Sequence, residues 1–256
     1  MALRMSVDLN ADLGEYTGLE GAARDALIMD VVTSANIGCG VHAGDLDVMK
    51  RSVDLAARRD VAIGAHPSFP DREGFGRREM NMLPAELEDV IVSQIEALSA
   101  CCVAAGVGLR YVKPHGALYN LGARDEAVAR TIADSVRRAD SSLVLLGLYD
   151  SFLISEGERA GLTVASEGFP DRGYLDDGKL VPRVRADAVL HDPELVAARA
   201  VSMARDEYVN SVDGKRIKVV PDSLCIHGDN PEALELVKAA RAALETAGLI
   251  VAPFVK

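Results

Sequence analysis

Tryptophan is absent from this 256-residue sequence, and aromatic residues together make up only 4% of it. Positive charge is also scarce, because 28 lysines and arginines stand against 39 aspartates and glutamates, for a net charge of −11. Proteins that read nucleic acids need concentrated lysine and arginine, and readers of single strands add aromatic stacking platforms. The composition therefore excludes a nucleic-acid reader, while the acidity alone identifies no substrate.

Long apolar runs and paired cysteines are missing as well. No stretch of ~18 uncharged apolar residues occurs, which argues against a membrane span. The first residues carry acidic side chains and no apolar signal-peptide core. The four cysteines form no C-x-x-C pair, and the adjacent Cys101 and Cys102 cannot make an ordinary disulfide. We therefore expect a reduced, cytoplasmic protein with no membrane partner.

The chain is organised as an alternation of short apolar runs and longer amphipathic segments. Strands are predicted at residues 6–9, 31–37, 61–65, 109–113, 143–148, 163–167 and 223–226. Helices are predicted between them, notably over 46–59, over 84–106, and from Asn230-Pro231 to Gly248. This order predicts parallel strands joined by helical crossovers. Because 49% of the residues are apolar and the length suits one closed barrel, we expect a single domain over residues 1–256.

Two long segments, 69–82 and 169–189, interrupt this alternation. The second contains Asp176-Asp177-Gly178, which is typical of a hairpin turn. Both follow predicted strands, so both should lie above the carboxyl ends of the strands, where ligands of α/β proteins bind. Four arginines in these segments are candidates for holding an anionic substrate, with Arg78 expected to be solvated: Arg72, Arg77, Arg78 and Arg172.

Four of the five histidines, namely His42, His66, His115 and His227, follow predicted strands and have glycine or proline close by. One such histidine is usually structural, but a parallel barrel brings all its strand ends to one rim. The convergence therefore predicts a site suited to general acid–base chemistry or to a divalent metal. The fifth, His191, is expected on the surface.

The identity of a metal site stays open at this point. Asp12, His42 and His66 would make a set of two histidines and one carboxylate, but only the fold could bring them together, because no H-E-x-x-H motif is present. Cys39 is either a nucleophile beside His42 or, as we expect, a small buried apolar residue. Lys113 is either a catalytic or substrate-holding cation or a partner in a salt bridge at the rim.

Six segments follow one another through nearly the whole chain: VDLNADLGE, SANIGCGVHAGD, AIGAHPSFPDREGFGRR, VKPHGALYN, SEGFPDRGYLDDGKLVPR and CIHGDNP. Together they resemble the family of 5-oxoprolinase A subunits, also labelled LamB/YcsF. The resemblance implies an α/β fold, a seven-stranded variant of the β/α (TIM-like) barrel, similar to the polysaccharide deacetylases. It also implies ATP-dependent opening of 5-oxo-L-proline to L-glutamate, carried out with subunits B and C. The chain has no G-x-x-x-x-G-K-[ST] loop, so ATP is handled unconventionally here or by partner chains.

Under this resemblance we expect Asp12, His42 and His66 to activate water, directly or through a divalent metal. Lys113 and His115 would stabilise charge on the former carbonyl oxygen or on phosphate. The predicted substrate-binding residues are Asn10, Asn36, Asp45, Glu167, Asp171, Arg172, His227 and Asp229.

Two other functions fit the same residues. One is a metal-dependent deacetylase or amidohydrolase that acts on a carbohydrate or small amide without ATP. The other is a non-catalytic subunit that binds a metabolite for a partner. The activity of the isolated chain and its assembly with further copies of itself are left open.

Overall fold

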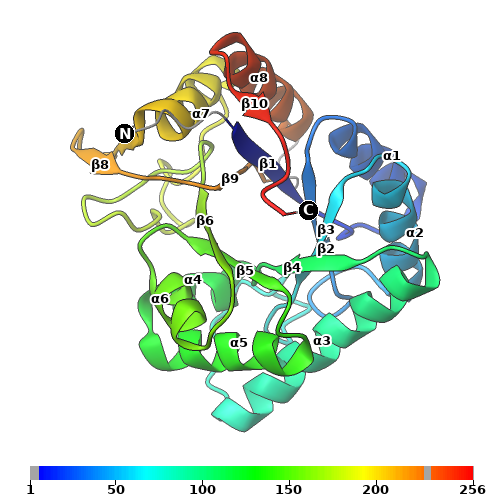
Figure 1. Cartoon of the computed structure of the whole chain (residues 1–256). Coiled ribbons are helices and arrows are strands. Elements are labelled where there is room, and N and C mark those ends of the chain that lie inside the picture. Colours follow the sequence, from blue (N-terminus) through cyan, green and yellow to red (C-terminus); the bar gives the residue numbers. More distant parts are fainter. Residues whose placement is uncertain (1–5, 228–231, 256) are drawn as a thin grey trace.

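The computed structural model describes residues 6–227 and 232–255, and seven parallel strands form a closed barrel at its centre (Figure 1). Each strand pairs with the next, and β9 pairs with β1 to close the ring. The strands are β1 (Ser6–Leu13), β2 (Ser34–Gly38), β3 (Ala62–His66), β4 (Leu109–Val112), β5 (Val144–Leu148), β6 (Val164–Gly168) and β9 (Ser223–Cys225). The predicted seven-stranded β/α barrel is confirmed.

Helices surround the barrel and cover the outer face of its strands (Figure 1). They are α1 (Gly18–Met29), α2 (Leu46–Ala57), α3 (Pro84–Ala104), α4 (Gly116–Arg124), α5 (Glu126–Ala139), α6 (Phe152–Arg159), α7 (Pro193–Asp206) and α8 (Ala233–Thr246). The helices predicted over 46–59 and 84–106 correspond to α2 and α3. The predicted start of the last helix at Asn230-Pro231 lies outside the described residues. Within the described part of the chain, no helix is both long and apolar enough to cross a membrane.

The strand β1 shows how the sequence builds a barrel with a polar interior. Its residues alternate, so that Leu9 and Leu13 join the apolar core while Asn10 and Asp12 hydrogen-bond with residues of other strands inside the barrel. The strand extends to Leu13, four residues beyond the predicted end. Polar residues at alternate positions therefore belong to the strand itself and not to the loop after it.

The chain's C-terminal segment covers the amino end of the barrel. The short strand β10 (Ile250–Val251) pairs with the first residues of β1 and leads the chain toward the middle of the ring (Figure 1). Phe254 packs edge-on against Tyr111, with ring centroids 5.0 Å apart, and Val255 joins a buried cluster with Tyr111 and Leu146. Apolar side chains thus close the middle of the barrel at this end.

The two long segments agree with the predictions: the first follows a barrel strand, and the second contains the predicted hairpin. Segment 69–82 follows β3 without regular secondary structure, and segment 169–189 contains the predicted hairpin, in which Tyr174 bridges Leu180 and Leu175 N donates to Lys179 O. The antiparallel pair β7 (Tyr208–Asn210) and β8 (Arg216–Lys218) and the strand β10 were not predicted from the sequence.

Candidate active site

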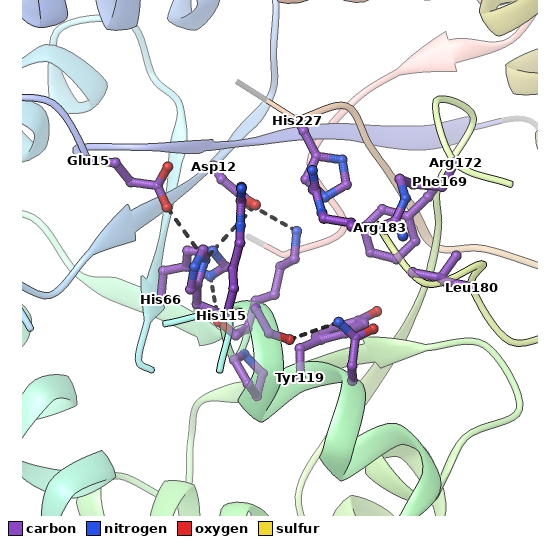
Figure 2. A pocket seen from close by; sticks show the side chains of 15 residues that line it. Asp12, Glu15, His66, His115, Tyr119, Phe169, Arg172, Leu180, Arg183 and His227 are labelled. Atoms are coloured by element: carbon purple, nitrogen blue, oxygen red, sulfur yellow. Dashed lines mark hydrogen bonds and ion pairs between the residues drawn. The ribbon is translucent and has the colours of Figure 1, made fainter. Parts of the chain in front are cut away.

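A pocket opens at the carboxyl end of the barrel strands and has charged and aromatic walls (Figure 2). Its empty volume, mouth included, is about 460 Å³. A larger groove of about 1260 Å³ lies at the opposite end, but its lining has only Asp60 and Arg110 as charged residues. The first pocket is lined by Asp12, Glu15, His66, Arg77, Lys113, Pro114, His115, Gly116, Tyr119, Asn120, Phe169, Arg172, Leu180, Arg183 and His227. We therefore place the candidate site there.

Lys113 provides a buried positive charge at the bottom of this pocket. Only 2% of its surface is exposed, and its Nζ lies 3.0 Å from Asp12 Oδ1 and 3.0 Å from Glu167 Oε1. Burial opposes the charge, but Asp12, Cys225 and Glu167 overcome this effect and raise the pKa of Lys113 well above its ordinary value. Lys113 is therefore an ammonium ion held between two carboxylates, and not a salt bridge at the exposed rim.

Asp12 is oriented by the contacts of one of its two oxygens. Oδ1 accepts hydrogen bonds from Asn36 Nδ2 at 2.8 Å and from Lys113 Nζ. Oδ2 faces His66 Nε2 at 3.4 Å. Although burial favours the neutral acid, His66 and Lys113 hold the pKa of Asp12 well below its ordinary value. Asp12 is thus a carboxylate with one oxygen directed at the histidines.

Asn10, Asn36 and Glu167 lie beneath the pocket instead of lining it. Asn10 Nδ2 donates to Glu167 Oε1 at 2.9 Å, and Asn36 Nδ2 donates to Asn10 Oδ1 at 2.7 Å. Tyr119 completes the network by donating from its hydroxyl to Glu167 Oε2 at 2.9 Å. Asn10, Asn36 and Glu167 are fully buried, so in this structure none of them is exposed to the pocket as a substrate contact would be. The long β1 and the inward face of β2 instead make them the support for Asp12 and Lys113.

Three of the predicted histidines form one cluster. His42 stacks on His115 with ring centroids 3.9 Å apart, and His66 lies edge-on to both rings. His42 Nε2 is 3.0 Å from Glu15 Oε1. Burial lowers the pKa of His42 and lowers that of His115 further, well below its ordinary value. Both are therefore neutral imidazoles, and Glu15, which was not predicted as a site residue, belongs to the cluster.

Backbone carbonyls fix the proton positions on two of these rings. His66 Nδ1 lies 2.7 Å from Lys113 O, and His115 Nε2 lies 2.8 Å from Phe75 O. Because a carbonyl oxygen can only accept, each ring carries a proton on the nitrogen that faces the carbonyl. The remaining nitrogens, His66 Nε2 and His115 Nδ1, point at each other across 3.0 Å.

Segment 69–82 is held over the barrel by its own contacts and by α4. Gly76 O accepts from Ala117 N at 2.9 Å, and a Cβ on Gly116, which has a φ of +54°, would lie 2.6 Å from that oxygen. Arg72 donates to the carbonyls of Gly40 and Gly44, and Arg78 pairs with Asp71. These two arginines shape the loop that presents Phe75 O to His115; Arg78 is exposed, as expected, but not unpaired.

The opposite wall of the pocket centres on His227 (Figure 2). Its ring stacks on Phe169, and its Nδ1 lies 2.8 Å from Asp171 Oδ2. Asp171 is fully buried and orients His227 from behind. The guanidinium of Arg172 donates to Ala188 O and Val181 O, both at 2.8 Å, so it mainly holds segment 169–189 while still lining the pocket.

Two predicted substrate residues are not found in the pocket. Asp45 is exposed and caps α2, accepting from Val48 N at 2.9 Å, and it does not line the pocket. Asp229 lies outside the described residues. As expected, His191 is exposed and Cys39 is buried, and burial raises the pKa of the Cys39 thiol to about 12.

The fold and the pocket define a β/α-barrel protein with a buried cluster of titratable side chains at the carboxyl ends of its strands. The LamB/YcsF family model matches residues 7–256, and the chain belongs to this family. A curated relative from Heliobacterium modesticaldum, named as the A subunit of 5-oxoprolinase, is 50% identical over 247 residues, which cover 96% of this chain and 97% of the relative.

Two solved structures are similar to this chain. The structure of the lactam utilization protein from Thermus thermophilus is 44% identical in sequence and superposes with a TM-score of 0.89, covering 97% of this chain and 99% of that one. A deacetylase solved with its substrate has a TM-score of 0.50 at 15% identity, covering 97% of this chain and 87% of that one. This second likeness concerns the fold alone.

Proposed function

We propose that this chain is the A subunit of an ATP-dependent 5-oxoprolinase, which hydrolyses 5-oxo-L-proline to L-glutamate while ATP is cleaved to ADP and phosphate. The names of the relatives support a role in such an enzyme, and the identity extends over nearly their full length. Because those names denote one subunit among others, they also support a complex, whose partners we propose to be subunits B and C.

The reaction explains why ATP is needed. The lactam is an unstrained amide, and its carbonyl carbon reacts poorly with water. In the reaction steps that we propose, the lactam oxygen first accepts the γ-phosphoryl group of ATP, and ADP leaves. Water then adds to the activated carbon, the ring C–N bond breaks with protonation of the amine, and a second water releases phosphate from the acyl phosphate. We assign the ring opening to the pocket of this chain and the nucleotide handling to the assembled complex.

The observation that carries this proposal is the buried ammonium of Lys113 next to Asp12 and His66. An ammonium fixed in a water-poor pocket stabilises negative charge that develops on the lactam oxygen or its phosphate. Asp12 Oδ2 and His66 Nε2 face each other at 3.4 Å in the same region, and as a pair they can accept the proton of the attacking water. Acid and base chemistry are thus supplied within a few ångströms of each other.

The geometry changes the role expected of His115 and His42. The proton of His115 is committed to Phe75 O, so its inner nitrogen cannot donate to an oxyanion. His42 lies behind Glu15 and acts as a positioning residue. At the pocket walls, Arg77, Arg172 and Arg183 offset the cost of admitting an anionic substrate to an acidic protein.

The test is reconstitution of the chain with its subunits B and C, followed by measurement of glutamate released from 5-oxoproline with and without ATP. We expect release that requires ATP and all three chains. No release from the complete complex, together with ATP-independent hydrolysis of acetylated sugars by this chain alone, would replace the proposal with a deacetylase. His191→Ala, at an exposed position outside the pocket, serves as the matched control and should retain full activity.

A further inference from the structure

The inner nitrogens of His66 and His115 face each other across 3.0 Å, without a donor from elsewhere in the described chain between them. The outer nitrogen of each ring faces a carbonyl oxygen, Lys113 O or Phe75 O, and therefore carries a proton. The two inner nitrogens lie 3.0 Å apart and have room for one shared cation between them, in a region where both residues are at most 4% exposed. Such a contact is repulsive unless a positive charge lies between the two nitrogens.

The third group at this point is a carboxylate oxygen. Asp12 Oδ2 lies 3.4 Å from His66 Nε2, and the ligand atoms of Asp12, His66 and His115 all lie within 4.8 Å of one another. Two metal–ligand bonds of about 2.1 Å separate their ligand atoms by about 3.0 Å at a right angle and about 3.4 Å at a tetrahedral angle. The two measured separations fall on these values.

The groups behind each ligand atom are also those of a metal site. Metal-binding histidines usually donate their other N–H to a carbonyl or carboxylate, and this fixes the ring. His66 and His115 both do so, and Asp12 uses its other oxygen for Asn36 and Lys113. Glu15 Oε1, 3.5 Å from His115 Nδ1, supplies a further acidic group on the same side.

We propose that His66 Nε2, His115 Nδ1 and Asp12 Oδ2 bind one divalent transition-metal ion, with Glu15 as an adjacent fourth group. Two imidazoles and one carboxylate favour Zn²⁺ or Co²⁺ over Mg²⁺, which prefers oxygen ligands. This set differs from the one expected from the sequence, because His115 replaces His42. Tied to Glu15 through Nε2, His42 stacks on His115 and orients it. When bound, the ion would occupy the Asp12 and His66 atoms that otherwise accept a proton from water, and it would supply Lewis acidity at the bottom of the pocket in place of that direct acceptance.

The experiment titrates the chelator-treated full chain with Zn²⁺ by calorimetry and with Co²⁺ by visible absorption. We expect one ion per chain, the absorption of an N/O-coordinated Co²⁺, and binding at least tenfold weaker for Mg²⁺. His66→Ala and His115→Ala should each abolish stoichiometric binding, whereas His227→Ala, in the same pocket but outside the ligand set, should retain it. His42→Ala should weaken binding about 10- to 100-fold, as the loss of a supporting contact does.

Failure is recognisable independently of the enzymatic function. If the folded wild-type chain binds no Zn²⁺ or Co²⁺, or if His227→Ala abolishes binding while His115→Ala does not, the metal site is wrong. A proton shared between the two rings would then explain their contact. Glutamate release by the complex could persist in that case, so the metal-site proposal can fail while the proposed 5-oxoprolinase function holds.

Discussion

Lys113 belongs both to the buried polar network inside the barrel and to the lining of the pocket. Its ammonium satisfies Asp12 and Glu167 at once, and both carboxylates are buried. An ion pair of this kind adds little stability by itself, but removing one partner leaves an uncompensated charge in a medium of low polarity. The same residue therefore matters for stability and for activity, and the two effects need separate measurements.

Replacing Lys113 should destabilise the protein through the carboxylates it leaves behind. Lys113→Met should lower the free energy of unfolding by about 3–5 kcal/mol at neutral pH. Adding Glu167→Gln should recover part of that loss, because it removes one of the two unpaired charges. Urea unfolding followed by circular dichroism measures both variants, and a double variant less stable than Lys113→Met would contradict the explanation.

Asp25, on α1, gives a prediction for pH. Burial is the main cause that raises its pKa to about 6, against the hydrogen bond from Gly14 N and the nearby Arg51, which lower it. Because the pKa of Asp25 is higher in the folded state than in the unfolded state, its contribution to the free energy of unfolding is fully present below about pH 4. That contribution is lost as the pH rises through about 6. Asp25→Asn keeps an acceptor for Gly14 N and removes this loss.

The stability difference between Asp25→Asn and wild type should therefore move in favour of the variant between pH 4 and pH 7, by about 3 kcal/mol at most. Parallel urea titrations at the two pH values measure it. A difference that is the same at both values, or that moves in favour of the wild type, would show that Asp25 is ionised without penalty.

At the scale of the elements, the sequence predicted the order of strands and helices better than their ends. Apolar runs located all seven barrel strands, because β/α crossovers repeat the same pattern. The end of β1 was misjudged because Asn10 and Asp12 are polar, although they alternate with Ala11 and Leu13 as residues of a strand do. The strand β10 was missed because two residues carry no periodicity.

The sequence predicted where the candidate site lies, but it did not predict the hydrogen-bond partners of the site residues. Histidines after successive strands indicated the rim, and His42, His66 and His115 do meet there. Their partners could not be predicted, since Phe75 O and Lys113 O are backbone atoms whose position depends on the fold of segment 69–82 and β4. Asp45 misled for the opposite reason, because an aspartate after a strand is equally typical of a helix cap.

The packing between β3 and β4 gives a prediction at this scale. Gly64 faces the ring of Tyr111, and a Cβ there would lie 2.2 Å from Tyr111 Cε2. Since Tyr111 is fully buried and donates its hydroxyl proton to Asn36 Oδ1, the ring cannot move without loss. Gly64→Ala should cost about 3 kcal/mol of unfolding free energy. Gly108→Ala, whose nearest contact is the flexible Arg110 guanidinium at 3.3 Å, is the control and should cost under about 1 kcal/mol. Equal effects of the two substitutions in urea unfolding would contradict this packing argument.

At the scale of the whole molecule, the net charge of −11 and the proposed anionic substrate make opposite demands. The structure reconciles them by separating the charges: Lys113 is buried at the bottom of the pocket, and Arg77, Arg172 and Arg183 line its walls. The acidic residues elsewhere favour solubility and do not define the site. Net charge was therefore a poor guide to the ligand, because it averages over a barrel whose two ends differ in chemistry.

The most direct test of the proposed function is the rate of ATP-dependent glutamate release from 5-oxoproline by the three-subunit complex containing His66→Ala. Removing a group that accepts the proton of the attacking water should lower kcat about 100-fold or more. The variant chain should still assemble with subunits B and C and retain a cooperative thermal transition, and the complex with His191→Ala should match wild type. Near-normal glutamate release by the His66→Ala complex would contradict the assignment of ring opening to this pocket.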